Sequence, residues 1–180
     1  MTINYATIKF LCLLSLLILY GNKSYSQEES NLVKHVSSLV YHEAADGFAT
    51  ADDEVKWTIT SDAGELTQYY DSIRGIHYGS SSEEIQYLTF KTSDFPNTYL
   101  IERIVVNASS AEGAKANIAI QVGNNNPIYQ DGTVSSKSAD YSFDINQYGA
   151  ITVKLRHPQK TKKALYLKSI KVYYSAPPCA

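Results

Sequence analysis

The chain has 180 residues, with 16 Lys and Arg against 18 Asp and Glu, so its formal net charge is −2. That length fits one domain with a targeting segment, and it excludes a multidomain enzyme within these residues. The near-neutral charge argues against a dedicated nucleic-acid-binding protein, which concentrates basic residues on one face.

The first 26 residues have the pattern of a secretory signal peptide. Lys9 precedes an apolar run of 11 residues, Phe10 to Tyr20. As a helix this run rises only about 16 Å, which is too short to span a membrane. Ser24 and Ser26 are the small residues expected before a cleavage site. We therefore expect a mature chain without a transmembrane anchor, located outside the cell, in a periplasm or at the cell surface.

Cleavage after residue 26 changes the composition of the chain. It removes Lys9, Lys23 and Cys12, leaving 154 residues with a net charge of −4. Cys179 then has no internal partner, and either a frayed terminus or a disulfide-linked dimer is consistent with its position. We divide the chain into a signal peptide (1–26), an N-terminal segment leading into the domain (27–50), a β-sandwich domain (51–176) and a short tail (177–180).

The mature chain is dominated by apolar and polar residues that alternate with a period of two, which is typical of strands with one buried face. Residues 31–42 alone could form a short helix, and the sequence leaves that segment ambiguous. The clearest alternation is in residues 55–60, 117–122 and 151–156, and further candidate strands are residues 85–92, 99–109, 141–145 and 165–174.

The last candidate strand contains a change of phase. The apolar residues Leu165 and Leu167 stand at odd-numbered positions, whereas those that follow stand at even-numbered ones: Ile170, Val172 and Tyr174. Since a slip of one residue turns every side chain to the opposite face, this pattern predicts a β-bulge near residues 168–169. With turn signals between them, about eight or nine short strands predict an all-β fold, an antiparallel β-sandwich or jelly roll.

Catalytic and cofactor signals are scarce. The sequence has no H-E-x-x-H zinc motif, no G-x-S-x-G nucleophile motif and no glycine-rich phosphate loop. We therefore expect no enzymatic activity and no cofactor, with calcium as the exception. Asp46, Asp52 and Asp53 precede the first clear strand, and they are either solvated turn residues or oxygen ligands of a calcium ion.

Aromatic and basic residues gather before the strand at 85–92. An exposed tyrosine ring can stack on a sugar, and an arginine and a histidine add directed hydrogen bonds. The alternative explanation is that the tyrosines simply pack within strands. Trp57, Tyr141 and Tyr174 occupy the same alternate positions as the apolar residues of their strands, so we assign them to the core. The candidate ligand-binding residues are Tyr69, Tyr70, Arg74 and His77, together with Asn125 and Tyr129.

A modification signal lies within the same segment. The triplet Asp71-Ser72-Ile73 resembles the acidic, hydroxyl, aliphatic sequence that is O-glycosylated in some secreted bacterial proteins. We therefore expect Ser72 as a candidate modification site.

Several segments together resemble a β-sandwich family found in secreted proteins of gut-type anaerobic bacteria, which is similar to galactose-binding-like jelly rolls. The resemblance covers about three-quarters of the mature chain. It implies a fold and an extracellular setting, and it supplies neither catalytic residues nor a ligand. The segments that carry it are residues 74–80, 88–90, 104–109, 118–123 and 163–172.

These observations lead to one main functional hypothesis and two alternatives. The main hypothesis is a secreted, noncatalytic module that binds a carbohydrate or glycan. The first alternative is a structural or protein-interaction β-sandwich with an extracellular protein partner at the cell surface. The second is a polysaccharide hydrolase. We expect no nucleic-acid partner.

Overall fold

A computed structural model describes residues 33–41, 48–50, 57–63, 69–92 and 95–177. All regular secondary structure in these ranges is β-strand, and every strand pair is antiparallel. The strands form two sheets, one of seven strands and one of five. The predicted fold class, an all-β antiparallel sandwich, is confirmed.

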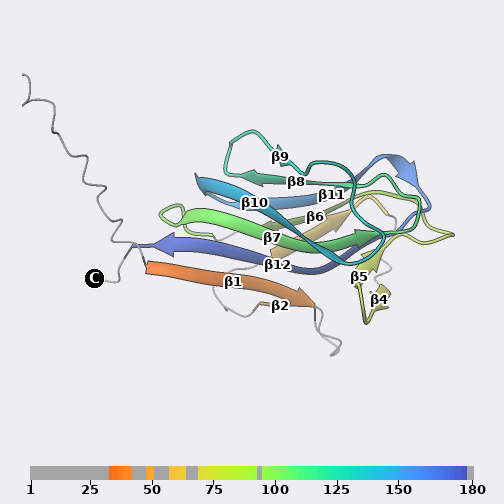
Figure 1. The fold of residues 1–180 in the computed structure, drawn as a ribbon, viewed down its shortest axis with the longest axis horizontal. Helices are drawn as coiled ribbons and strands as arrows, with labels where there is room; N and C mark the ends of the chain where they lie inside the picture. Colours follow the sequence, from red (N-terminus) through yellow and green to blue (C-terminus); the bar gives the residue numbers. More distant parts are fainter. Residues whose placement is uncertain (1–32, 42–47, 51–56, 64–68, 93–94, 178–180) are drawn as a thin grey trace, which may run out of the picture. The chain divides into compact units, whose positions relative to one another are not determined.

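The seven-stranded sheet is built around one long strand near the C-terminus. Its main path runs in the order β10, β7, β12, β1, β2, and the hairpin of β4 and β5 adds to β12 (Figure 1). These strands are β1 (Val33–Tyr41), β2 (Phe48–Thr50), β4 (Tyr69–Asp71), β5 (Gly75–Tyr78), β7 (Leu100–Ser110), β10 (Ala139–Tyr148) and β12 (Leu165–Ala176).

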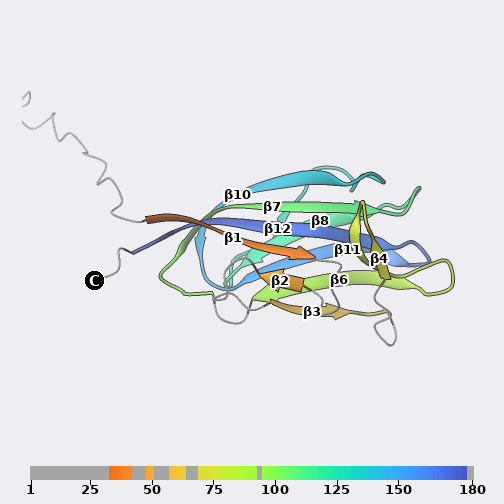
Figure 2. The same cartoon turned by 90° about the horizontal axis from the view of Figure 1, so that it is seen from below.

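The five-stranded sheet carries the clearest alternation in the sequence. Its order is β3, β6, β11, β8, β9, and Figure 2 shows β6 and β3 in a layer below β10, β7 and β12. These strands are β3 (Trp57–Ser61), β6 (Ile85–Thr92), β8 (Asn117–Val122), β9 (Ile128–Tyr129) and β11 (Ile151–Thr161).

One hydrophobic core lies between the two sheets. Its fully buried side chains come from both, for example Leu88, Phe90 and Ile120 from the five-stranded sheet and Ile104 and Leu167 from the seven-stranded sheet. In β8 every second residue is buried. The predicted one-sided burial of this strand is therefore confirmed, and its remaining side chains face outward.

The aromatic residues assigned to the core do pack there. Tyr174 is buried, and Trp57 and Tyr141 are partly buried against the core. Tyr174 stacks on Tyr99 with ring centroids 5.1 Å apart, and Phe95 meets both rings edge-on.

Within the segment at residues 31–42 that the sequence leaves ambiguous, residues 33–41 form strand β1 and not a helix. Eight of its residues pair with β12, from Val33 opposite Ala176 to Val40 opposite Ser169. Its β-branched valines suit a strand, but the partner that fixes the strand lies more than a hundred residues away in the sequence. The seven-stranded sheet therefore begins with β1 and β2, before residue 51.

The predicted bulge in the last strand is confirmed. The register between β12 and β7 shifts between Leu167 and Ser169, and Lys168 is exposed while Leu167 and Ile170 are buried. At this bulge β5 comes very close to β12, because a Cβ atom on Gly75 would lie 2.2 Å from the carbonyl oxygen of Leu167.

In the part of the chain that the structure describes, no helix has the length and apolar character needed to cross a membrane.

Candidate functional site

The outer face of the five-stranded sheet presents three rows of aligned side chains. The register of the strands defines the rows, because directly paired residues point to the same face. The first row is Gln121, Thr152, Lys91 and Thr58; the second is Tyr129, Ala119, Lys154, Thr89 and Thr60; the third is Asn117, Arg156 and Tyr87.

A shallow hollow of about 220 Å³ lies over the middle row. Ala119 forms its floor, because its methyl group leaves space between the longer side chains of the paired Tyr129 and Lys154. Tyr129 is 60% exposed, which is unusual for so large an apolar ring in this fold. The hollow is lined by Asn117, Ala119, Gln121, Pro127, Tyr129, Thr152, Lys154 and Arg156.

A tight loop holds one polar group at the end of this hollow. The side-chain amide of Asn125 donates to the carbonyl oxygen of Val122 at 2.9 Å, and the backbone N–H of Asn125 donates to the same oxygen at 3.2 Å. The amide nitrogen of Gln121 in turn donates to the carbonyl oxygen of Asn125 at 3.0 Å. The Gln121 side chain is therefore held in one orientation, with its amide nitrogen toward the loop.

A cation on the opposite side of the hollow is also held in place. The Lys154 ammonium lies 4.5 Å from the centroid of the Tyr87 ring, a distance at which a cation is attracted to the ring face. A second hollow of about 440 Å³ continues the outer face toward β3, and it is lined by Thr58, Thr60, Thr89, Lys91, Thr92 and Ala150.

The predicted residues Arg74 and His77 lie elsewhere, on the hairpin of β4 and β5. Asp71 closes the hairpin turn, because its Oδ1 accepts from the backbone N–H groups of Ile73 and Arg74, both at 2.9 Å. Its Oδ2 accepts from Nε and Nη2 of Arg74 at 3.2 and 3.1 Å. The backbone N–H of Arg74, supported by that of Ile73 and by the guanidinium, lowers the pKa of Asp71 against the opposing effect of burial.

The same hairpin residues pack against Tyr166 of β12. The Arg74 guanidinium lies 3.8 Å from the centroid of the Tyr166 ring, and the His77 ring centroid lies 4.7 Å from it. Burial lowers the pKa of His77, and its Nδ1 lies 3.4 Å from the carbonyl oxygen of Gly79. These contacts attach the hairpin to β12, so a ligand-binding role for Arg74 and His77 stays a prediction.

The structure therefore separates the predicted ligand-binding residues into two groups. Tyr69 and Tyr70 lie in β4, where their backbones pair with His77 and Ile76, so they belong to the hairpin group. Asn125 lies in the loop between β8 and β9, and Tyr129 lies in β9, so both belong to the five-stranded sheet or its loops. Figure 1 shows β8 and β9 on the opposite side of the domain from β4 and β5. A role for the two β4 tyrosines in binding is also a prediction still.

Ser72 is exposed in the hairpin turn, beside Ile73, which is 72% exposed. Its position is accessible to a modifying enzyme, and its O-glycosylation stays a prediction.

The calcium hypothesis concerns residues outside the described part of the chain, namely Asp46, Asp52 and Asp53. Cys179 lies outside it as well. Among the described residues, no group of three or more His, Cys, Asp or Glu side chains is arranged to hold a metal ion.

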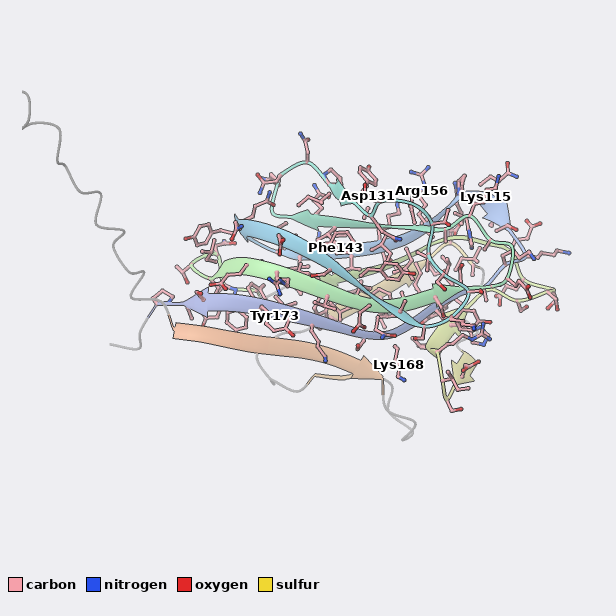
Figure 3. The ribbon with its side chains drawn as sticks, in the orientation of Figure 1. Lys115, Asp131, Phe143, Arg156, Lys168 and Tyr173 are labelled. Carbon is pink, nitrogen blue, oxygen red and sulfur yellow. The ribbon has the colours of Figure 1, made fainter. Side chains whose placement is uncertain are left out.

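The seven-stranded sheet carries a larger hollow of about 600 Å³ on its own outer face. It is lined by Leu100, Glu102, Arg103, Asp144, Asn146 and Tyr173, and Figure 3 labels Tyr173 on this sheet and Arg156 on the other. The charged groups here satisfy one another, because Arg103 pairs with Asp144 at 3.1 Å and Glu102 accepts from the Ser175 hydroxyl. Arg103 and Glu102 already have partners within the protein, so we favour the hollow beside Tyr129 as the ligand site.

Of the eight residues that line the hollow beside Tyr129, seven are not among the predicted site residues. Five of these carry polar or charged side chains: Asn117, Gln121, Thr152, Lys154 and Arg156. Each occupies an outward position in a strand that the alternation did predict. The alternation of each strand predicts that these side chains face away from the core. Only the pairing of β11 with β8, and of β8 with β9, places them around the same hollow.

The sequence matches no family model, and it matches no curated protein. Among solved structures, it is similar to a family two carbohydrate esterase from Cellvibrio japonicus at 10% identity and a TM-score of 0.43, over 82% of this chain and 37% of that chain. The chain therefore spans well under half of the esterase's length.

Carbohydrate-binding modules are also among the solved structures that resemble this chain. TmCBM61, solved in complex with β-1,4-galactotriose, has 10% identity and a TM-score of 0.43 over 64% of this chain and 86% of that chain. A family 29 carbohydrate-binding module has 8% identity and a TM-score of 0.46 over 78% of this chain and 89% of that chain. At these values the likenesses do not identify a ligand for this chain, so its function has to be inferred from the chemistry of its own site.

Proposed function

We propose that this protein is a secreted, noncatalytic carbohydrate-binding domain, and that the sugar binds in the hollow between Tyr129 and Lys154. The single observation that carries the proposal is an exposed aromatic ring at the edge of a small-residue floor, with polar side chains around it. A sugar ring has an apolar face that can stack on tyrosine and a rim of hydroxyl groups that need hydrogen-bond partners. The hollow offers both kinds of contact.

Each side chain has a distinct part in the proposed complex. The Tyr129 ring supplies the stacking surface. Gln121, Asn117 and Thr152 supply amide and hydroxyl groups for the sugar hydroxyls, and all three lie on neighbouring central strands. Because strands hold side chains more rigidly than loops, little conformational entropy is lost when the sugar binds.

The noncatalytic part of the proposal rests on the chemistry of the same hollow. Its described lining residues include amides, hydroxyl groups and cations, and no Asp or Glu. Glycoside hydrolysis commonly needs two carboxyl groups on either side of the scissile bond. We therefore expect polysaccharides incubated with the protein to yield no new reducing ends, although they bind to it.

The test is a screen of oligosaccharides by calorimetry, with the β-1,4-galactotriose bound by TmCBM61 among the probes. For a ligand that binds, Tyr129→Ala should weaken the affinity by roughly tenfold or more, because truncating an aromatic anchor removes a dominant contact. Tyr148→Ala is the matched control, since Tyr148 is 51% exposed on β10 of the other sheet. It should leave the affinity unchanged.

A third variant separates the proposed site from the hairpin. Arg74→Gln removes the guanidinium that lies over Tyr166, and we expect it to bind sugar as the wild type does, provided that its circular dichroism is unchanged. If Arg74→Gln loses binding while Tyr129→Ala retains it, the sugar binds at the hairpin and our site is wrong. If no glycan binds and a protein partner is recovered instead, the carbohydrate-binding function itself is wrong.

A further inference from the structure

The described strands of the five-stranded sheet carry cations and no carboxylates on their outer face. Each of its three rows contains one cation, namely Lys91, Lys154 or Arg156. Among the described residues of these five strands, the outward positions hold no Asp or Glu.

This charge is a local property of the face. The chain as a whole has a net charge of −2, so its cations do not reflect a generally basic composition. On the outer face of the other sheet, one cation, Arg103, does pair with a carboxylate, that of Asp144. A face whose cations have no ion-pair partner among the described residues, in a protein of slightly negative net charge, is suited to an anionic partner.

One described carboxylate just beyond these strands is bound to the backbone. Asp62 follows directly after β3, and its Oδ1 accepts from the backbone N–H groups of Gln86 and Tyr87 at 2.8 and 2.9 Å. These bonds hold the carboxylate against the backbone of β6. Its role is therefore to attach the end of β3 to β6, and no ion pair joins it to the cations on the sheet.

The cations have a spacing that suits a repeating ligand. Lys154 and Arg156 are two residues apart on β11, so their Cα atoms lie about 7 Å apart on the same face. Lys91 lies on the adjacent β6, opposite Thr152. A chain of sugar rings that crosses the sheet would therefore meet one cation after another.

We infer that the ligand of this face is an acidic polysaccharide whose sugar rings carry carboxylate groups. This inference rests on the proposed carbohydrate-binding function and names the class of glycan. One ring stacks on Tyr129 over Ala119, and its carboxylate, or that of the next ring, pairs with Lys154 and Arg156. The planar guanidinium of Arg156 matches a carboxylate in a two-point hydrogen bond.

The neighbouring groups favour a glycan over a nucleic acid. Asn117, Gln121 and Thr152 line the hollow with amide and hydroxyl groups, which suit the hydroxyl groups of a sugar. Single-stranded nucleic acid is bound on several stacking rings in a strongly basic groove. On this face Tyr129 is the exposed ring, whereas Tyr87 is partly buried with Lys154 over its ring.

The experiment compares two forms of one polymer, polygalacturonate and its methyl-esterified form, which has the same rings without the charge. We expect polygalacturonate to bind at least about fivefold more tightly at low salt, with the difference shrinking as salt is added. Lys154→Gln and Arg156→Gln should each weaken its binding by roughly three- to tenfold, as expected for partly exposed ion pairs. Lys171→Gln, which removes the same charge from the other sheet's outer face, should have no effect.

The outcomes separate this inference from the proposed function. If a neutral glycan binds in a Tyr129-dependent manner and polygalacturonate binds no better than its ester, the acidic ligand is wrong and the carbohydrate-binding function stands. If no glycan binds, both are wrong. If dextran sulfate or single-stranded DNA binds as tightly as polygalacturonate and loses affinity in the same variants, the face binds polyanions in general, and the assignment to a carboxylated glycan is overturned.

Discussion

His157 is a titratable side chain buried within β11, with 1% of its surface exposed. Its Nε2 lies 2.8 Å from the carbonyl oxygen of Lys163, so Nε2 carries a proton and donates it. Its Nδ1 is buried without a hydrogen-bond partner among the described residues. Protonation of Nδ1 would place a charge in the interior, and burial therefore lowers the pKa of His157 below its ordinary value of 6.5.

This lowered pKa predicts a loss of stability in mild acid. Below pH 6.5 the unfolded chain takes up a proton that the folded state resists, so the free energy of unfolding falls as the pH drops through this range and is fully retained above it. The fall attributable to one histidine is at most about 1.4 kcal/mol per pH unit. Urea unfolding at pH 7.5 and 5.5 measures it.

The matched variant for this prediction is His157→Gln, which keeps a side-chain donor for the Lys163 carbonyl and removes the titration. Its stability should fall less between pH 7.5 and 5.5 than that of the wild type. Burial also lowers the pKa of His77, so part of the fall should remain in the variant. An undiminished fall in His157→Gln would show that other groups cause the acid sensitivity.

At the scale of elements, the β4 and β5 hairpin depends on one glycine. Gly75 has a φ of +85°, a conformation that costs other residues about 1–2 kcal/mol, and an added Cβ would lie 2.2 Å from the backbone oxygen of Leu167. Gly75→Ala must therefore also push β5 away from β12. We expect it to lower the free energy of unfolding by about 2–4 kcal/mol, measured by urea denaturation.

Gly132→Ala is the control for the backbone conformation alone. Gly132 has a φ of +80°, and apart from its own residue and its two neighbours in the chain, no described residue has a heavy atom within 4 Å of the position of its Cβ. It should cost only about 1–2 kcal/mol. If the two variants lose the same stability, the close approach between β5 and β12 contributes nothing, and strain at the glycine is the whole effect.

The strands show which features the sequence predicts, namely bounds and bulges, and which it does not, namely the distant partner of a strand. Alternation marked residues 85–92 and 117–122 with the bounds that the structure has, and the phase change in the last strand located its bulge. These are local properties, because the alternation of apolar and polar residues within one strand shows which of its faces is buried. The sequence leaves the β1 segment ambiguous, because the partner that fixes it as a strand, β12, lies at the other end of the chain.

The candidate site had the same limit. Asn125 and Tyr129 were recognised from a loop and an aromatic residue, whereas Lys154 and Arg156 looked like ordinary solvated positions in a strand. Pairing of β11 with β8, and of β8 with β9, places them around Ala119. Register between strands is a tertiary property that no single strand encodes, so the cluster could not be assembled before the fold was known.

At the scale of the whole domain, the two sheets share one core while their outer faces differ. The five-stranded sheet carries the hollow beside Tyr129 and three cations with no ion-pair partner among the described residues, whereas the hollow on the seven-stranded sheet contains the Arg103–Asp144 ion pair. Burial of alternate residues in β8 and β11 fixes which side chains reach the outer face. Packing of the core therefore also determines the positions of the side chains around the hollow. A substitution that disrupts the core should lower ligand affinity as well as the free energy of unfolding.

A shared core also predicts that the two sheets unfold together. Trp57, the single tryptophan, lies on β3 and reports on the five-stranded sheet, whereas far-UV circular dichroism reports on all strands. Because the core cluster joins residues of both sheets, the urea transitions seen by the two signals should coincide. Phe90 is fully buried in that cluster, so Phe90→Ala should remove about 3–5 kcal/mol and shift both transitions equally.

Thr60→Ala is the control for this variant, because Thr60 is exposed on the outer face of β3. It should change the free energy of unfolding by less than about 0.5 kcal/mol. If the tryptophan signal in Phe90→Ala moved to lower urea while the circular dichroism signal stayed in place, the five-stranded sheet would be a separate folding unit. The binding face would then be able to open without the rest of the domain, and the rigidity that we assign to the hollow would be lost.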